Sequence, residues 1–444
     1  MKKYLFLTAL CSLALPAAAL DPLGAYRVQP PAGCVDKDVT TQSLNLEDII
    51  QISLCTNPAL ASQYMSVKVQ EATLGAARAD YLPIVTLTGT GQITGDKMEH
   101  GRYVQNEPVQ GKAEASWLLF NFGGREANIR SIRLYTRAAQ SQYDATSHNL
   151  LLSVQTAYLN LLAAQESLVS AKASLDTYKQ SYEEAQKRYK LGMVSLSDKL
   201  QAKTRYEQSL LAVVQQENLV KQNSGALAVL INVRPDVEIS LTKPTFNDQD
   251  TKITNDNVQE LMTQALEKRP ELLAQQSTQE AAKSNLTAAR ARLLPSLSVT
   301  ATAGIGDNWK HHSPYAVNNA AGLLLKWPIF SGFANMYAAE QASYLYKQTQ
   351  SQTDNIKRQI ENEVWSAYQN YKTAERSYEI SQTVLESAEE NHRVAFRYYE
   401  VGKTDILNLL SAVAQLADAR QNKITAFYSL LLSKANLYRS IGEN

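Results

Sequence analysis

The sequence contains two long copies of one pattern, and this duplication limits the fold more than any other feature. Residues 78–83 (RADYLP) recur 212 positions later as residues 290–295 (RARLLP). Two more motifs recur in the same order at an offset of 210: WLLF at 117–120 with WPIF at 327–330, and YKLG at 189–192 with YEVG at 399–402. Three ordered matches at nearly constant spacing indicate a tandem duplication of a large unit, too long for a short-repeat solenoid.

The motifs divide the chain into five segments. The predicted segments are a signal peptide (1–19), an N-terminal extension with Cys34 (20–43), a first repeat (44–232), a polar linker (233–256) and a second repeat (257–444). The first repeat is predicted to contain a helix, a β-hairpin at 81–120, and long helices at 125–190 and 193–230. The second is predicted to contain a helix, a β-hairpin at 293–330, and long helices at 334–401 and 404–441.

Each predicted hairpin begins with a run of alternating character, which is the period of a β-strand. One side of the run in the first repeat carries the small apolar residues Val85, Leu87 and Gly89. The same side of the run in the second repeat carries Leu297, Val299 and Ala301. The opposite side carries hydroxyl residues: Thr86, Thr88 and Thr90, and Ser298, Thr300 and Thr302. This alternation is typical of strands with one face toward lipid and one toward water.

The remainder of each repeat is predicted to be helical. Only 18 Gly and 13 Pro occur in 444 residues, and neither type occurs between 125 and 190, a stretch long enough for a helix of roughly 100 Å. Val364, Tyr371, Tyr378 and Leu385 follow one another at heptad spacing, which indicates coiled-coil pairing. We interpret this stripe as helix packing rather than as a ligand site.

The N-terminus predicts export. Two lysines precede an apolar run at 4–15, and Pro16 then leads into three alanines, the pattern of a secretory cleavage site. The alternative, a short membrane anchor, is disfavoured because about 12 apolar residues fall short of the roughly 20 that span a bilayer. Removal of the signal leaves Cys34 and Cys55, which predicts a disulfide worth about 3 kcal/mol; two unpaired buried thiols are the alternative.

Composition and motifs exclude several functions. The chain has 44 basic and 43 acidic residues, so its net charge is only +1 and gives no indication of nucleic-acid binding. No zinc-protease motif, nucleophile elbow, P-loop or dinucleotide fingerprint is present, and we therefore expect no enzyme and no cofactor. The pair His311 and His312 falls in a predicted hairpin loop, where we expect solvation rather than metal binding. No later segment has 18 consecutive apolar residues, so transmembrane helices are not expected.

Taken together, the duplicated motifs resemble the TolC family of outer-membrane efflux and secretion channels. The resemblance rests on the RAxxLP entry to each hairpin, the WxxF exit before a very long helix, and the YxxG turn that another helix follows. It covers nearly the whole mature chain from about Leu44. It implies a homotrimer in the outer membrane of a Gram-negative bacterium, in contact with outer-membrane lipid. Each chain would give four strands to one 12-stranded β-barrel, which a coiled-coil α-helical tunnel would continue into the periplasm, with the 233–256 linker near its equator. Independently, four strands cannot close a barrel, so the strand count itself favours an oligomer.

The resemblance also implies site residues. Gly192 and Gly402 would lie at the helix tips that face a periplasmic adaptor protein. Tyr399 and Asp198 match two residues that hold the periplasmic gate closed in the best-known members. Thr404 stands where the family has an arginine, so the sequence departs from the family's charged lock there.

The function that the sequence predicts is a passive exit duct. An inner-membrane ABC exporter or a proton-driven pump would act with the adaptor and supply energy and substrate choice. The cargo could be a secreted protein or a small toxic compound, and the sequence leaves both open. The alternative from another class is a periplasmic coiled-coil structural or adhesive protein without a pore.

Overall fold

The computed structural model describes residues 43–97, 103–106, 108–242, 244, 246, 251–253, 256–308 and 316–443. The predicted signal peptide, almost all of the N-terminal extension with Cys34, the pair His311 and His312, and most of 243–255 lie outside the described residues.

The helices of the two repeats correspond one to one. The first repeat contains α1 (Leu46–Thr56), α2 (Pro58–Arg78), α3 (Gly124–Lys190) and α4 (Leu196–Leu230), and the second contains α6 (Val258–Lys268), α7 (Pro270–Ala291), α8 (Ala334–Glu400) and α9 (Ile406–Ser440). α3 and α8 each have 67 residues, and α4 and α9 each have 35. The duplication seen in the motifs therefore extends to the lengths of the elements.

Each repeat begins with two helices where the sequence predicted one. The break falls at Pro58 in the first repeat and at Pro270 in the second. Proline has no N–H to continue a helix and pushes the residue before it out of the helical region. Asn57 and Arg269 accordingly have extended backbones, with ψ of 121° and 120°.

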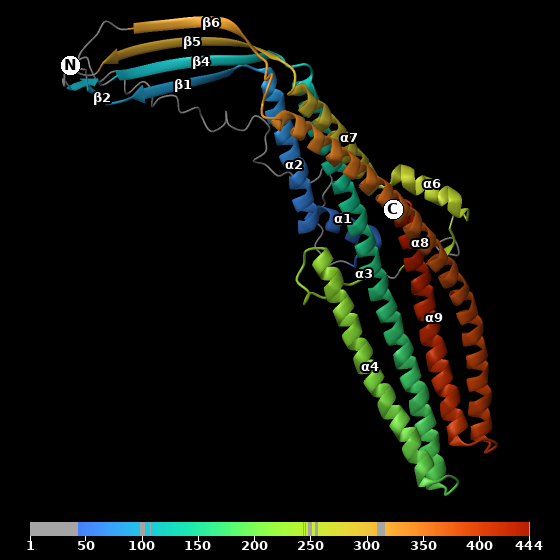
Figure 1. Cartoon of the computed structure of the whole chain (residues 1–444). Helices are drawn as coiled ribbons and strands as arrows, with labels where there is room; N and C mark the ends of the chain where they lie inside the picture. Colours follow the sequence, from blue (N-terminus) through green and yellow to red (C-terminus); the bar gives the residue numbers. More distant parts are fainter. Residues whose placement is uncertain are drawn as a thin grey trace. The chain divides into compact units, whose positions relative to one another are not determined.

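The chain divides into two compact units. The sheet unit comprises Met65–Gln142 and Glu271–Asn355, and the helical unit comprises the rest. Four antiparallel strands of the sheet unit, β1 (Ile84–Gly91), β4 (Pro108–Phe120), β5 (Ser296–Asn308) and β6 (Ala316–Lys326), lie in the order β1-β4-β5-β6 (Figure 1). The contact of β4 with β5 joins the two repeats into one sheet.

The first hairpin carries an extension that the sequence analysis did not predict. β2 (Thr94–Lys97) pairs with β3 (Tyr103–Asn106) as a separate two-stranded ribbon. The offset between the copies is 212 residues before the hairpins and 210 after them. The difference in length between the repeats is therefore confined to the hairpins.

The turn from each hairpin into the long helix contains two consecutive residues with positive φ. These are Phe122 (52°) and Gly123 (80°) in the first repeat, and Gly332 (59°) and Phe333 (62°) in the second. Glycine adopts this left-handed conformation freely, whereas a residue with a side chain gives up about 1–2 kcal/mol. Each copy thus holds one strained phenylalanine, at swapped positions of the pair.

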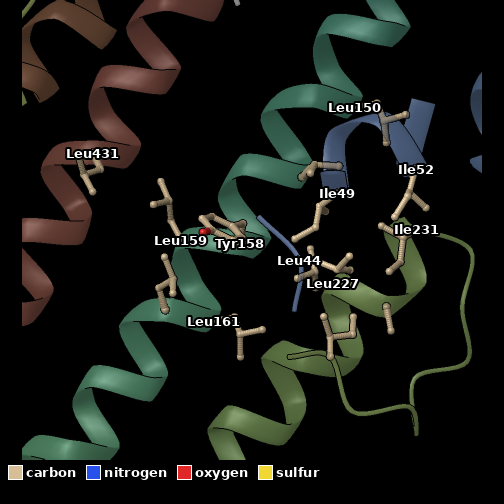
Figure 2. Close-up of a cluster of buried hydrophobic side chains, with 14 of the residues drawn as sticks. Leu44, Ile49, Ile52, Leu150, Tyr158, Leu159, Leu161, Leu227, Ile231 and Leu431 are labelled. Atoms are coloured by element: carbon tan, nitrogen blue, oxygen red, sulfur yellow. The ribbon is translucent and has the colours of Figure 1, made fainter. Parts of the chain in front are cut away.

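The main core of the helical unit gathers α1, α3, α4 and α9. Leu44, Ile49, Leu161, Leu227 and Ile231 are buried there, as the close-up in Figure 2 shows. The N–H of Leu44 donates to Ser240 (2.9 Å), and its carbonyl accepts from Thr242 (2.9 Å). These backbone bonds attach the segment after α4 to the chain before α1.

Tyr371 shows how the heptad stripe is used. The side chains of Val364 and Tyr371 are fully buried along α8. The Tyr371 hydroxyl donates to the Thr251 carbonyl (2.9 Å) and to Glu375 (3.1 Å). Burial, together with the bond to Glu375, raises the pKa of Tyr371 to about 12. The stripe packs helices, as predicted, and one of its tyrosines also holds the segment before α6.

Candidate functional site

The register of the sheet separates apolar from polar side chains. Cross-strand partners share a face, so each row of partners can be assigned to one side. One face carries the rows Val85–Ala115–Ala301–Ala321, Trp117–Val299–Leu323 and Phe120–Leu297–Leu325. The other carries Thr86–Glu114–Thr302–Ala320 and Thr88–Lys112–Gly304–Asn318. In these rows the alternation predicted for the first strand of each hairpin continues across the neighbouring strands. Near the strand ends it breaks down, since Asp307 lies on the apolar face and Leu118 and Leu324 lie on the polar face.

The apolar face has no cover in the described part of the chain. Val85 and Leu87 are each 70% exposed, and Leu323 and Leu325 are 71% and 68% exposed. A contiguous exposed apolar surface of this kind marks contact with lipid or with another protein. On the opposite face, Lys112 and Glu114 form an ion pair of 2.8 Å that remains open to water.

The outer edges of β1 and β6 pair with no strand of the described residues. An edge strand exposes a row of N–H and C=O groups that cannot be left unsatisfied in a bilayer. The four-stranded sheet is therefore incomplete as a membrane structure.

The entry and exit motifs of the hairpins contact one another. The indole N–H of Trp117 donates to the carbonyl of Tyr81 (2.9 Å), and that of Trp327 donates to the carbonyl of Leu293 (3.3 Å). Tyr81 and Leu293 are the second residues before the proline of each entry motif. The tryptophan of the WxxF motif thus fixes the start of the first strand to the end of the last in each hairpin.

At the far end of the long helices, Gly192 and Gly402 form tight turns. Their φ angles are +72° and +71°, and a Cβ built on either would meet nothing within 4 Å. Only the backbone conformation therefore demands glycine. The N–H groups of Gly192 and Gly402 donate to the carbonyls of Tyr189 and Tyr399, both at 3.0 Å. The adaptor-facing role of these two glycines remains a prediction.

The predicted gate residues Tyr399 and Asp198 are not hydrogen-bonded to each other. Tyr399 is buried, and its hydroxyl has no hydrogen-bond partner among the described residues. Asp198 accepts instead from the backbone N–H of Ser195 (3.0 Å), while the Ser195 hydroxyl accepts from the N–H of Asp198 (3.1 Å). This reciprocal capping box begins α4 and occupies the carboxylate. Thr404 lies half-buried in the turn before α9.

Arg188, which the sequence analysis missed, connects the two tips. Its guanidinium lies 4.7 Å from the centre of the Tyr399 ring, and its Nη2 donates to the carbonyl of Glu400 (2.6 Å) at the end of α8. Glu184, one turn earlier in α3, lies 3.4 Å from Nε. Burial raises the pKa of Tyr399, and the nearby Arg188 opposes that shift. A buried cation thus binds the carbonyl end of a helix, where positive charge is favourable.

The sequence carried one signal for Arg188. It lies four residues before Gly192, on the turn that ends α3, where basic residues complement the helix dipole. The contact with α8 joins residues 212 positions apart, and no local pattern reports it.

Cys55 lies near the end of α1 and is disulfide-bonded. Cys34 lies outside the described residues, so the pairing of these two cysteines remains a prediction. Among the described residues, no cluster of three His, Cys, Asp or Glu side chains could hold a metal ion. No helix in the described ranges is long and apolar enough to cross a membrane.

An uncovered amphipathic sheet and long paired helices in one chain are the features of the class of outer-membrane channel proteins. The chain belongs to the outer membrane efflux protein family, whose model matches residues 49–233 and 261–443. It is 27% identical to protein CyaE of Bordetella pertussis over 95% of this chain and 88% of that protein. It is 26% identical to outer membrane protein TolC of Vibrio cholerae over 90% of both.

Solved structures give the same fold. The outer membrane protein VceC of Vibrio cholerae superposes with a TM-score of 0.78 at 18% identity, over 90% of this chain and 96% of that one. The predicted resemblance, the outer-membrane location and the fold class are thereby confirmed. The family is one of channel proteins, and the chain is an outer-membrane export channel.

Proposed function

We propose that three copies of the chain close their sheets into one 12-stranded barrel. The edge of β6 in one copy would pair with the edge of β1 in the next, which satisfies the backbone groups that one chain leaves unpaired. Four strands fall short of the eight that form the smallest such barrels. The uncovered apolar face then faces lipid, and this observation carries the proposal.

The polar face of the sheet lines the lumen in this assembly. Its threonines and the Lys112–Glu114 pair keep the wall wetted and near neutral charge. Such a wall suits a passive conduit for proteins or small toxic compounds. The channel is the exit duct of a tripartite efflux pump or of a type I secretion system. A periplasmic adaptor, together with an inner-membrane ABC or proton-driven transporter, supplies the energy, and the duct itself carries out no catalysis.

The helix tips form the periplasmic entrance in this proposal. Gly192 and Gly402 allow turns narrow enough to face the adaptor. Tyr399, Asp198 and Thr404 lie at the gate, where Asp198 stiffens the start of α4. Arg188 supports the closed arrangement because it ties α3 to the end of α8 within each chain.

Conductance in planar lipid bilayers tests the proposal. The purified chain is expected to have the mass of a trimer and to give single-channel current steps of uniform size. A monomer that gives no steps would favour the alternative, a periplasmic structural or adhesive protein without a pore.

A further inference from the structure

A cavity of about 450 Å³ lies in the sheet unit, where the strands of both hairpins meet the helices. The first repeat contributes Asp80, which follows α2, together with the end of β4 and the first turn of α3. The second repeat contributes the end of α7, the first residue of β5 and the last residue of β6. The cavity is therefore formed at the seam between the two repeats, which β4 and β5 join.

Three of the side chains that line the cavity are cationic, and one is a carboxylate. The cations are Arg125, Arg292 and Lys326, and the carboxylate is Asp80. Arg125 is already engaged, because its Nη1 donates to a backbone carbonyl of β4 (2.8 Å) and its Nη2 pairs with Glu126 (3.2 Å). Its side chain therefore supports the wall of the cavity and has little charge left to offer a ligand.

Arg292 and Lys326 have no such partners. Both are exposed, and neither side chain forms a hydrogen bond or an ion pair with any other residue in the described ranges. The carboxylate of Asp80 forms no ion pair with a described residue either. Two cations thus stand against one carboxylate, and an anion that enters the cavity meets net positive charge.

The equivalent positions of the two repeats carry different charges. With the offsets of 212 and 210 residues, Arg292 corresponds to Asp80 and Lys326 corresponds to Ser116. The proline of the entry motif and the tryptophan of the exit motif, by contrast, are the same in both copies. The two cations therefore do not belong to what both hairpins share, and they give this seam a charge that the duplicated fold does not require.

Apolar side chains complete the cavity next to the cations. Leu118, Leu294 and Pro328 form part of its wall. Ser296 and Lys326 are opposite one another in the register, at the end of the polar face of the sheet. A ligand that reaches Lys326 along that face comes through water. The arrangement suits a molecule with one anionic end and one apolar body.

We propose that the cavity binds a small organic anion, namely a carboxylate or phosphate group on an apolar body, with Arg292 and Lys326 holding the charged end. The guanidinium of arginine matches the geometry of both oxyanions, and lysine adds a point charge. The volume falls within the range of about 300–1,000 Å³ that is usual for small-molecule sites. The proposal rests on the proposed function, in which the polar face lines the lumen, so the ligand is a solute in the duct.

Fluorine NMR of the purified full chain in detergent micelles measures this binding without requiring a pore. The probe is para-fluorobenzoate, and para-fluorobenzamide is an uncharged control of the same size. At low salt, the fluorine resonance of the benzoate is expected to broaden when the protein is added, while that of the benzamide stays sharp. Because the two cations are exposed, sodium chloride is expected to reverse the broadening.

Three variants identify the residues. Arg292→Gln with Lys326→Gln is expected to weaken the binding of para-fluorobenzoate by roughly tenfold or more, because two charged donors are lost. Arg290→Gln with Lys283→Gln removes the same charge from exposed positions of α7 outside the cavity, and is expected to bind like the parent. Asp80→Asn is expected to bind about two- to fivefold more tightly, because a like charge is removed. A misfolded chain would not bind more tightly.

Three results would overturn the proposal. Equal broadening of the two probes would mean that charge plays no part, and equal weakening in the two double variants would mean that the cavity plays none. An anionic lipid offers the same chemistry as the soluble probe. Displacement of para-fluorobenzoate by phosphatidylglycerol, but not by phosphatidylcholine, added to the micelles would make lipid the ligand.

Single-channel recording of the same preparation separates this proposal from the proposed function. If current steps are seen and the benzoate does not bind, the anion site alone fails. If no steps are seen, the duct of the proposed function fails, and the assignment of the ligand to its lumen fails with it.

Discussion

Arg188→Met is the most direct test of how the two tips are held together. The arginine side chain is 9% exposed, donates to the Glu400 carbonyl and stacks over Tyr399. A hydrogen bond from a charged donor contributes about 1.5–3 kcal/mol, and a cation–π contact about 0.5–2 kcal/mol. Because desolvation of the guanidinium offsets part of this, we expect a loss of about 2 kcal/mol per chain, or roughly a 30-fold shift in a local opening equilibrium. Methionine keeps the apolar stem, so packing is largely retained.

Hydrogen exchange followed by mass spectrometry reads this opening. The amides of Gly402 and Lys403 donate to the carbonyls of Tyr399 and Tyr398, and their protection depends on the closed tip. In Arg188→Met their exchange is expected to rise about 30-fold, while the sheet exchanges as in the parent.

Arg397→Met is the matched control. Arg397 also lies in the last turn of a long helix and pairs with Glu400 (3.3 Å), but its side chain is 74% exposed. Exposed ion pairs contribute about 0.2–1 kcal/mol, so exchange at the tip should change only a few-fold at most. If Arg188→Met and Arg397→Met behave alike, the buried cation does not hold the tips.

Three further results are expected. Tyr399→Phe should leave the thermal midpoint of the purified protein unchanged or slightly higher, because the buried hydroxyl has no hydrogen-bond partner in the described part of the chain. Asp198→Ala should cost about 0.5–2 kcal/mol in chemical unfolding through loss of the α4 cap. Because the pKa of Tyr371 is about 12 in the folded state and about 10 in the unfolded state, the free energy of unfolding should fall as pH rises from 10 to 12. Tyr371→Phe should reduce this fall by up to about 1.4 kcal/mol per pH unit. An unchanged slope of stability against pH would contradict this. Non-reducing mass spectrometry should find Cys34 and Cys55 in one linked peptide, and free thiols on both would refute their pairing.

Features with a period or a local rule could be predicted from the sequence. The alternation from Val85 gave a strand because side chains on a sheet have a period of two, and the heptads through Tyr371 gave a packed helix. Gly192 and Gly402 marked the tight turns because few other residues adopt positive φ.

Features that depend on tertiary contacts or on competing local hydrogen bonds could not be predicted from the sequence. The sequence Ser195-x-x-Asp198 is itself a capping signature, yet the family resemblance led us to interpret the aspartate as a gate residue. The reach of Arg188 to the end of α8 depends on two helices that meet in space. The left-handed backbone at Phe122 contradicts the ordinary preference of an aromatic residue, so propensity argues against it.

The equal lengths of the paired helices restrict how this chain can evolve or be redesigned. Removal of one residue from α3 would move its tip by about 1.5 Å along the helix axis and rotate it by about 100°. This is enough to break the 2.6 Å hydrogen bond between Arg188 and the carbonyl of Glu400. We expect a deletion in α3 to be tolerated only together with deletions of the same length in α8, α4 and α9. The hairpins, which already differ in length, carry no such constraint. Away from the glycine turns, the two tryptophans and the buried stripe, the two copies can thus diverge in side chains while their helices stay matched in length. The residue count between the glycine turns and the strands is therefore a mark of their common origin.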